Sequence, residues 1–166
     1  MKKICYVALA TFLLMFSGCN TNRNTNYINP DKASKENMEQ VLDYLNNDDT
    51  EGLKGMFCEK IKVSGSLDDE LNQAMEFFEG KIDSYDDLTT PNIEKVEGGR
   101  QVEVRISPSI NVTTTNGQTY EIRLNSCLVN VEDEEKVGIS EIHMKRSDGK
   151  EINIGNYYIV NPRTSD

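Results

Sequence analysis

The first half of the chain carries apolar residues at the spacing of amphipathic helices. The clearest stripe, at positions i, i+3, i+4 and i+7, consists of Met38, Val41, Leu42 and Leu45. Asp31 or Ser34 can cap the start of this helix, and Thr50 can cap a short second one. Ser66, with Asp69 three residues later, resembles a capping box and predicts a third helix. The inward positions of this third helix should be Leu71, Ala74, Met75 and Phe78.

From residue 81 onward the apolar period changes to two, which is typical of strands with one buried face. The clearest alternating positions are Val102, Val104 and Ile106, and then Tyr120, Ile122 and Leu124. A three-residue loop at 115–117 would place Val112 opposite Tyr120 and keep the apolar side chains on one face. The same loop length at 147–149 would place Met144 opposite Ile152. We therefore expect two hairpins with three-residue loops that end in glycine.

The order of these elements predicts a fold class. Helices followed by a long antiparallel meander are typical of an α+β fold in which helices pack on one face of the sheet. Pro108 interrupts the first hairpin strand, and because proline has no N–H to donate, it predicts an edge or a bulge and hence a bent sheet. We expect a single α+β domain over residues 31–166, with its N-terminal helices packed on a curved antiparallel sheet.

The chain begins with a short apolar run between polar segments. Lys2 and Lys3 precede the 13-residue run 4–16, and the small residues Ser17 and Gly18 follow it. A membrane-spanning helix needs about 20 apolar residues, so the run has the length of a signal-peptide core instead. Residues 1–18 are therefore expected to be a signal peptide.

The end of this leader, Ser17-Gly18-Cys19, resembles the lipobox of bacterial lipoproteins, although Phe16 stands where that family prefers leucine. The resemblance implies cleavage before Cys19, lipidation of its thiol with diacylglyceryl and palmitate-type chains, and anchoring on the extracytoplasmic face of the cell membrane. Two alternatives stay open: an ordinary secretory signal in which Cys19 is incidental, or an uncleaved anchor. The polar stretch that follows, within residues 19–30, is expected to be a flexible tether.

The charge of the chain limits its partners. The net charge is −10, and removal of the leader with its two lysines leaves −12, from 16 basic and 28 acidic residues. A body this acidic is repelled by nucleic-acid phosphates and by anionic lipid headgroups. Nucleic-acid binding is therefore not expected, and contact with the membrane should run through the anchor alone.

Few residues could carry chemistry. His143 is the one histidine in the chain, and Cys58 and Cys127 form no CxxC motif, so no zinc site or other cofactor site is predicted. The two cysteines could form a disulfide in an oxidising compartment, or both could be small core residues. The acidic clusters lack the spacing of a calcium-binding loop and fit helix caps, turns and solvated surface.

Tyrosine is the residue type most suggestive of a ligand site, because its hydroxyl can orient a ligand inside an apolar pocket. The candidates for ligand binding are Tyr44, Tyr85, Tyr120, Tyr157 and Tyr158. We place Tyr157 and Tyr158 on the last strand, one on each face. Tyrosine also fills strands well, so packing is the competing explanation for each of these residues.

Helices closing over a curved sheet resemble the cone of NTF2-like (cystatin-like) folds. More specifically, four segments within about residues 37–162 are similar to an uncharacterised family of small bacterial lipoproteins: LDYLNNDDTEGLKGMFC, ISPSI, TTTNGQTYEI and GNYYIVNP. This resemblance implies fold and location and carries no activity.

Three hypotheses about function follow. The first is a membrane-anchored, extracytoplasmic and non-enzymatic module that binds an unknown protein or small ligand. The second is an isomerase or dehydratase of the cone-fold type, for which Asp43, Asp86 and Tyr85 are the nearest candidates for a carboxylate in a dry pocket beside a tyrosine. The third is an immunity or inhibitor-like protein whose acidic surface matches a basic partner.

Overall fold

The computed structural model describes residues 27–161. The predicted signal peptide and Cys19 lie outside this range. The helices are α1 (Pro30–Asn47), α2 (Thr50–Gly55), α3 (Glu59–Lys62), α4 (Leu67–Phe77) and α5 (Tyr157–Val160). The strands are β1 (Ile82–Tyr85), β2 (Asn92–Glu97), β3 (Arg100–Ile106), β4 (Ser109–Thr114), β5 (Thr119–Asn130), β6 (Gly138–Arg146) and β7 (Glu151–Gly155), with a 3₁₀ turn (Glu134–Lys136) before β6. Within the described part of the chain, no helix is both long and apolar enough to cross a membrane.

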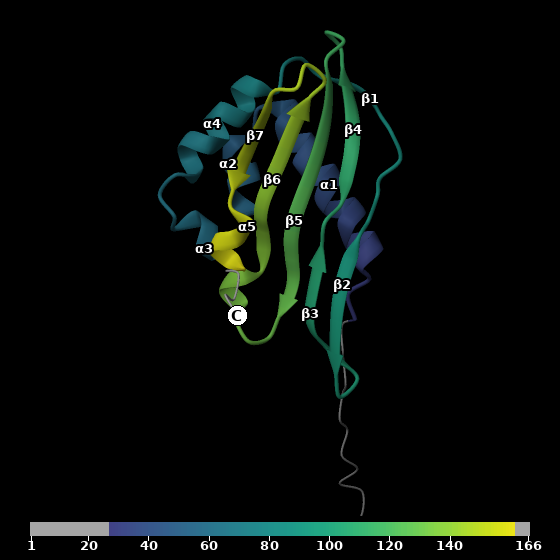
Figure 1. The fold of residues 1–166 in the computed structure, drawn as a ribbon, viewed down its shortest axis with the longest axis vertical. Coiled ribbons are helices and arrows are strands. Elements are labelled where there is room, and N and C mark those ends of the chain that lie inside the picture. Colours follow the sequence, from purple (N-terminus) through teal and green to yellow (C-terminus); the bar gives the residue numbers. More distant parts are fainter. Residues whose placement is uncertain (1–26, 162–166) are drawn as a thin grey trace, which may run out of the picture.

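All seven strands form one antiparallel sheet that is organised around β5 (Figure 1). One side of β5 pairs with β6, and the other pairs first with β4 and then with β3. β7 pairs with β6, β1 with β4 and β2 with β3, so the sheet is open and curved. The predicted α+β class, with N-terminal helices on a curved antiparallel sheet, is confirmed.

The bend expected at Pro108 is present, and it falls inside the sheet rather than at an edge. Pro108 lies between β3 and β4, and its C=O still accepts the N–H of Leu124 at 2.9 Å. The polypeptide from β3 through β4 therefore runs along one side of β5 as a single broken strand. Because proline has no N–H to donate, the chain can change direction at Pro108 without breaking a hydrogen bond donated by that residue.

Both predicted hairpins are confirmed, with their register. Val112 pairs with Tyr120 across the 115–117 loop, and Met144 pairs with Ile152 across the 147–149 loop. Gly117 and Gly149 end the two loops with φ of +80° and +88°. Only glycine adopts this left-handed conformation without strain, which explains why both loops have glycine at this position.

The first two helices are capped by residues other than those predicted. The Asn29 side chain caps α1 by accepting a backbone N–H three residues later at 3.0 Å, so neither Asp31 nor Ser34 is the cap. Asp49 caps α2 in the same way at 2.8 Å, and Thr50 is the first helical residue. Both caps belong to the residue class that prefers this position, and only the choice among neighbouring candidates was wrong.

The third predicted helix, α4, begins after Ser66 as expected, but the capping box is absent. The Ser66 side chain makes no capping hydrogen bond, because its backbone is in the right-handed helical region rather than extended (φ −101°, ψ −13°). The predicted inward face is confirmed by the burial of Leu71, Ala74 and Phe78. α3 was not predicted.

The last strand ends earlier than expected, and this changes the position of two candidate tyrosines. β7 stops at Gly155, whose φ is +74°, and Asn156 then caps the short helix α5 by accepting the N–H of Tyr158 at 2.9 Å. Tyr157 and Tyr158 therefore lie on α5, and their placement on opposite faces of a strand was wrong.

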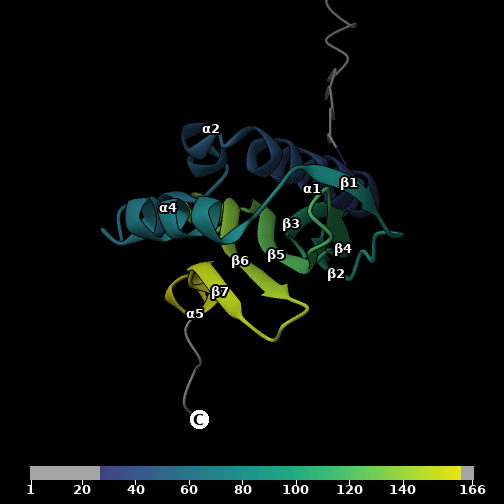
Figure 2. The ribbon, with the colours of Figure 1, turned by 90° about the horizontal axis from the view of Figure 1, so that it is seen from above.

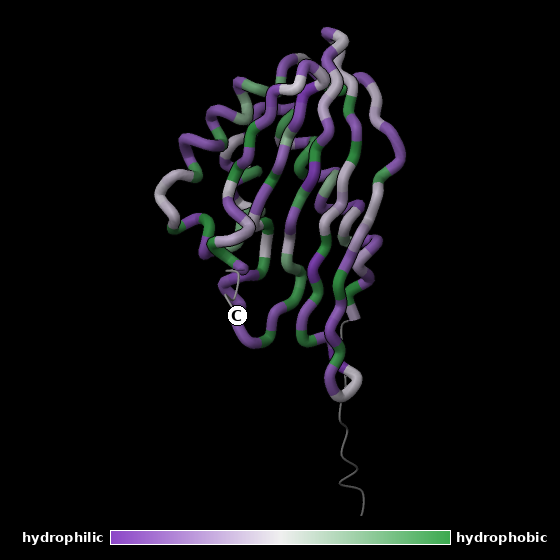
Figure 3. The backbone as a smooth tube through the Cα atoms, viewed as in Figure 1, coloured by the Kyte–Doolittle hydropathy of each residue, from purple (hydrophilic) through white to green (hydrophobic). Residues whose placement is uncertain are grey.

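The core occupies the space between the helices and one face of the sheet. Figure 2 shows α1 and α2 on one side of the sheet and α5 next to β7, the strand at one edge of the sheet. Hydrophobic and hydrophilic residues alternate along the strands, so that one face is apolar (Figure 3). Helix residues such as Val41 and Leu53 are buried together with the strand residues Ile122, Leu124 and Ile142, all at 0% exposure. Side chains therefore fill the helix-covered face of the sheet.

Candidate ligand-binding cleft

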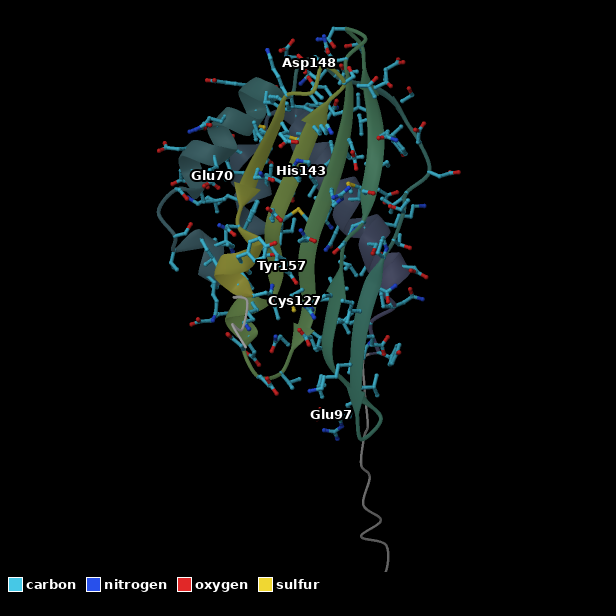
Figure 4. All side chains as sticks on the ribbon, viewed as in Figure 1. Glu70, Glu97, Cys127, His143, Asp148 and Tyr157 are labelled. Carbon is cyan, nitrogen blue, oxygen red and sulfur yellow. The ribbon has the colours of Figure 1, made fainter. Side chains whose placement is uncertain are left out.

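A small cleft lies on the face of the sheet that points away from α1. Val104 and Ile106 of β3 are buried, whereas Arg105 between them is only partly buried, so Arg105 projects from the other face of the strand. The cleft, of about 120 Å³, lies between Arg105 and α5, with β5 and β6 beneath it. Tyr157 and Cys127 are labelled close together on this face, with His143 farther along the sheet (Figure 4).

Arg105 and Tyr157 form the centre of the cleft. Nη1 of Arg105 donates a hydrogen bond to the Tyr157 hydroxyl at 3.0 Å. Nε of Arg105 lies 3.1 Å from Oε1 of Glu103 as an ion pair, without the geometry of a hydrogen bond. A guanidinium carries five N–H donors, so most of them remain available to a ligand. The tyrosine accepts with a lone pair and keeps its own O–H for another acceptor.

A hydrogen-bonded set of polar side chains forms the floor of the cleft. Asn125 accepts a bond from the Ser107 hydroxyl at 2.8 Å and donates one to Glu141 at 2.9 Å. The Ser140 hydroxyl donates to the main-chain carbonyl of Asn125 at 3.1 Å. These bonds fix the floor side chains in one arrangement, which favours a preformed site over one built on binding.

Two register shifts shape this floor. The β5–β6 pairing skips Ser140, and the β3–β5 pairing skips Leu128. An unpaired extra residue bends its strand and increases the local twist, and such bulges are common beside functional sites. The cleft lies beside these two shifts, where the sheet departs from a regular ladder.

Contacts from three elements hold α5, and with it Tyr157, over the cleft. The N–H of Gly155 donates to Oε2 of Glu70 on α4 at 2.7 Å. A Cβ on Gly155 would lie 2.5 Å from the Ser140 carbonyl oxygen, so only glycine allows this close approach. Val160, at the end of α5, is 2% exposed and belongs to the core. Tyr157 is therefore positioned by the packing of α5 against neighbouring elements rather than by strand pairing.

Cys127 and Cys58 are both buried free thiols, so the disulfide left open by the sequence is not formed in this structure. Burial raises the pKa of Cys127, which lines the cleft, to about 11. Its S–H donates to the carbonyl of Val129 at 3.2 Å. A neutral, hydrogen-bonded thiol is a poor nucleophile, so Cys127 is best suited to packing. Burial also raises the pKa of Cys58, the residue that precedes α3.

The five candidate tyrosines occupy different environments. Tyr120 is fully buried: its hydroxyl donates to the Phe77 carbonyl at 3.1 Å and accepts the Glu79 N–H at 3.0 Å, which is a structural role. Tyr85 and Tyr158 are more than half exposed. Tyr157 lines the cleft, and the structure therefore does not bring the five residues together into one site.

Tyr44 lies in a different hollow, a wide groove of about 770 Å³ between α1, α2 and the start of β6. Its ring packs on Gly52, where a Cβ would be 2.4 Å from the ring. Two exposed acids, Glu36 and Glu51, also line this groove. Among the described residues that line the groove there is no lysine, arginine or histidine, so it offers no counterpart to Arg105.

The other residues proposed for chemistry stand apart from the cleft. His143 is on the same outer face, opposite Asn153 as predicted, with Nε2 at 3.5 Å from Glu151. Asp43 and Asp86 are exposed, so neither occupies a dry pocket. Within residues 27–161, no group of three or more His, Cys, Asp or Glu side chains could hold a metal ion.

Sequence reasoning missed Arg105, the residue at the centre of the cleft. Its alternation with Val104 and Ile106 indicates an outward position and nothing more. The dipeptide Gly155-Asn156 could have indicated that β7 ends and α5 begins before Tyr157, since glycine and asparagine mark turns and helix caps.

The fold and the cleft together define a small α+β domain with a preformed polar site on the open face of its sheet. Residues 40–151, about two thirds of the chain, match a family model described as "Domain of unknown function (DUF5104)". The chain therefore belongs to this uncharacterised family. The matched region includes Arg105 and the floor of the cleft and ends before α5. No curated protein matches the chain.

Proposed function

We propose that this chain is a lipid-anchored, extracytoplasmic binding protein without enzymatic activity, and that its ligand binds in the cleft between Arg105 and Tyr157. We also propose that its helix-on-sheet architecture is of the NTF2-like (cystatin-like) kind. One observation carries the binding proposal: the guanidinium of Arg105 is held in place by Tyr157 and Glu103 with most of its donors unused. The buried Arg105 nitrogen without a hydrogen bond is Nε, and the two terminal nitrogens are not among the buried atoms that lack a partner. They are therefore open to an incoming acceptor, and hydrogen bonds from a charged donor are stronger than those from a neutral one.

The chemistry within the cleft supports binding rather than catalysis. Among the described residues that line it there is no carboxylate or histidine, and the two nearest carboxylates, Glu103 and Glu141, are engaged with Arg105 and Asn125. The isomerase or dehydratase hypothesis depended on Asp43, Asp86 and Tyr85, all of which are distant from the cleft or exposed. The binding hypothesis needs only the donors that are already positioned.

The start of the described chain supports the proposed anchor geometry. Both the N–H and the C=O of Ile28 bond to the Gln101 amide at 2.8 Å, and the Tyr27 hydroxyl donates to Glu94. These contacts bring the last residues of the predicted tether onto β2 and β3. A lipid on Cys19 would therefore attach the domain at the β2–β3 end, and the net negative charge would hold the rest of the domain away from anionic headgroups.

The anchor is tested with the Cys19→Ala variant of the full chain. We expect wild-type protein in the membrane fraction, carrying label from a radioactive fatty acid, and the variant without label. Loss of two buried acyl chains removes most of the membrane affinity, so the variant should move to the soluble extracytoplasmic fraction or stay as unprocessed precursor. A variant that remains labelled and membrane-bound with its mature mass would contradict the proposal.

Binding is tested by native mass spectrometry of the full chain, released from membranes of its own host in mild detergent. We expect a retained small mass in wild-type protein and its loss in Arg105→Gln. Arg123→Gln is the matched control: Arg123 projects from the same face of the sheet, lies outside the cleft and pairs with Glu121 at 2.8 Å. Equal retention by all three proteins, or no retained mass in any, would contradict binding at this cleft.

A further inference from the structure

We infer that the cleft binds the carboxylate of a monoanionic ligand that carries an apolar group next to its charge. This inference rests on the proposed function and names the class of ligand. Two sources share this chemistry: a small free acid, and the C-terminal residue of a peptide chain.

The charge of the cleft favours an anion. The chain is acidic overall, yet Arg105 is the charged residue among the described residues that line the cleft. The other polar lining groups are hydroxyls and amides, supplied by residues such as Asn125, Ser140 and Tyr157. The two nearest carboxylates are already engaged, Glu103 with Nε of Arg105 and Glu141 with the Asn125 amide. An anion entering the cleft therefore meets a cation and neutral donors, whereas a cation would meet Arg105 and no carboxylate among the described lining residues.

The geometry of Arg105 favours a planar acceptor. Glu103 approaches Nε, which leaves the two terminal nitrogens as the edge that faces other partners, and Nη1 also bonds Tyr157. Two parallel N–H groups match the two oxygens of a carboxylate. The free O–H of Tyr157 can donate to one of the same oxygens, so the ligand would receive three hydrogen bonds from two residues.

The charge balance favours a monoanion over a phosphate dianion. A dianion would need more than one cation to offset its desolvation. Within the described structure, Arg105 shares its charge with Glu103, and the surrounding body is strongly acidic. Because Arg105 carries one positive charge and already pairs with Glu103, it suits a singly charged carboxylate better than a dianion.

An exposed isoleucine beside the arginine accounts for the apolar part of the ligand. Ile93 of β2 is the register partner of Arg105, lines the cleft and is 59% exposed. Pro91 and Val160 add apolar surface to the walls. The volume of about 120 Å³ lies well below the ~300 Å³ of the smaller drug-sized sites, so the cleft accepts one end of a molecule rather than a whole large ligand.

The test measures calorimetric binding to the full chain, purified in detergent after removal of retained small molecules. The probes are N-acetyl-leucine, its carboxamide, and an acetylated six-residue peptide that ends in leucine with a free carboxylate. We expect both acids to bind, and the carboxamide to bind about tenfold more weakly or worse, because it loses a charge-assisted pair. Tighter binding of the peptide identifies a chain terminus as the source, and equal affinity identifies a free acid.

Variants connect the affinity to the cleft. Arg105→Gln should weaken N-acetyl-leucine binding by about tenfold or more, and Tyr157→Phe by about three- to tenfold, while Arg123→Gln should leave it unchanged. Arg105→Lys keeps the charge without the planar fork and should fall between wild type and Arg105→Gln, which separates recognition from misfolding.

Equal binding of acid and carboxamide, or no binding of either acid at millimolar concentration, would overturn the inference. If a mass retained from the host is still lost in Arg105→Gln, the proposed function stands and only the ligand class is wrong. If no mass is retained either, both proposals fail.

Discussion

Two arginines of the sheet differ in how fully their neighbours use them. Arg146 is 9% exposed: Nη1 bonds Glu79 at 2.7 Å, Nη2 bonds Asp148 at 2.9 Å, and the guanidinium lies 5.3 Å from the centre of the Phe77 ring. It joins the end of α4 to the hairpin between β6 and β7. Arg105 has one hydrogen bond and one ion pair of poorer geometry. Neighbouring side chains therefore bond both terminal nitrogens of Arg146 but only one of Arg105, and this difference is the basis of the proposed binding site.

The Arg146 pair predicts a pH-dependent contribution to stability. The Arg146 guanidinium, and secondarily the N–H of Lys150, lower the pKa of Asp148 to about 2. An aspartate in the unfolded chain titrates near 3.9. Because the folded-state pKa is the lower one, the contribution is fully present above about pH 4 and is lost as the pH falls toward 2.

Urea unfolding of wild-type protein and Asp148→Asn between pH 2 and pH 7 checks this prediction. The two proteins should differ most above pH 4 and converge at pH 2. The exposed Asp87, in the β1–β2 connection, supplies the control: Asp87→Asn should show no such convergence. A constant difference between wild type and Asp148→Asn across the range would mean that the pair does not act as described.

At the scale of the element, three glycines give a graded prediction. Gly55 ends α2 without a positive φ, and a Cβ there would meet nothing within 4 Å, so Gly55→Ala should stabilise by about 0.5–1 kcal/mol. Gly117 has equal space but a φ of +80°, so Gly117→Ala should destabilise by about 1–2 kcal/mol through backbone strain alone. At Gly138 a Cβ would lie 2.8 Å from the Cys58 nitrogen, so Gly138→Ala should cost more than Gly117→Ala.

Urea midpoints of the three variants measure this order. The expected ranking, from most to least stable, is Gly55→Ala, wild type, Gly117→Ala and Gly138→Ala. The ranking fails if Gly138→Ala is as stable as wild type, because β6 would then not pack against the Cys58 backbone as observed.

The same elements explain what could be predicted from the sequence. The two hairpins were predicted correctly because a three-residue loop is the shortest that keeps Val112 and Tyr120 on one face, a local constraint. The end of β7 was missed although Gly155-Asn156 is a local turn and cap signal, and the close approach of Gly155 to Ser140 of the neighbouring strand shows why glycine is needed there.

The cleft was beyond prediction for a different reason. Arg105 and Tyr157 are 52 positions apart, and their contact depends on the register shifts at Leu128 and Ser140 and on the docking of α5. Tyrosine count alone directed attention to five residues, of which Tyr120 proves to be part of the core. Residue type predicts what a side chain can do, whereas tertiary packing decides which side chains meet.

At the scale of the whole molecule, the two faces of the sheet differ: helices cover one face, and the other carries the cleft. Helices α1, α2 and α4 and their apolar residues occupy one face, and side chains fill that space. The opposite face carries polar residues such as Arg123 and His143 and holds the cleft beside α5. Because side chains fill the helix-covered face, the opposite face is the better candidate for a ligand site.

The most direct test of the account is amide NMR of the full chain in detergent, isolated from its host and compared with the same protein after unfolding, removal of small molecules and refolding. We predict that the amide signals of Arg105, Ser140 and Tyr157 differ between the two samples, while those of Tyr44 and Gly52 in the wide groove coincide. Differences confined to the groove, or identical spectra throughout, would contradict a ligand site in the cleft.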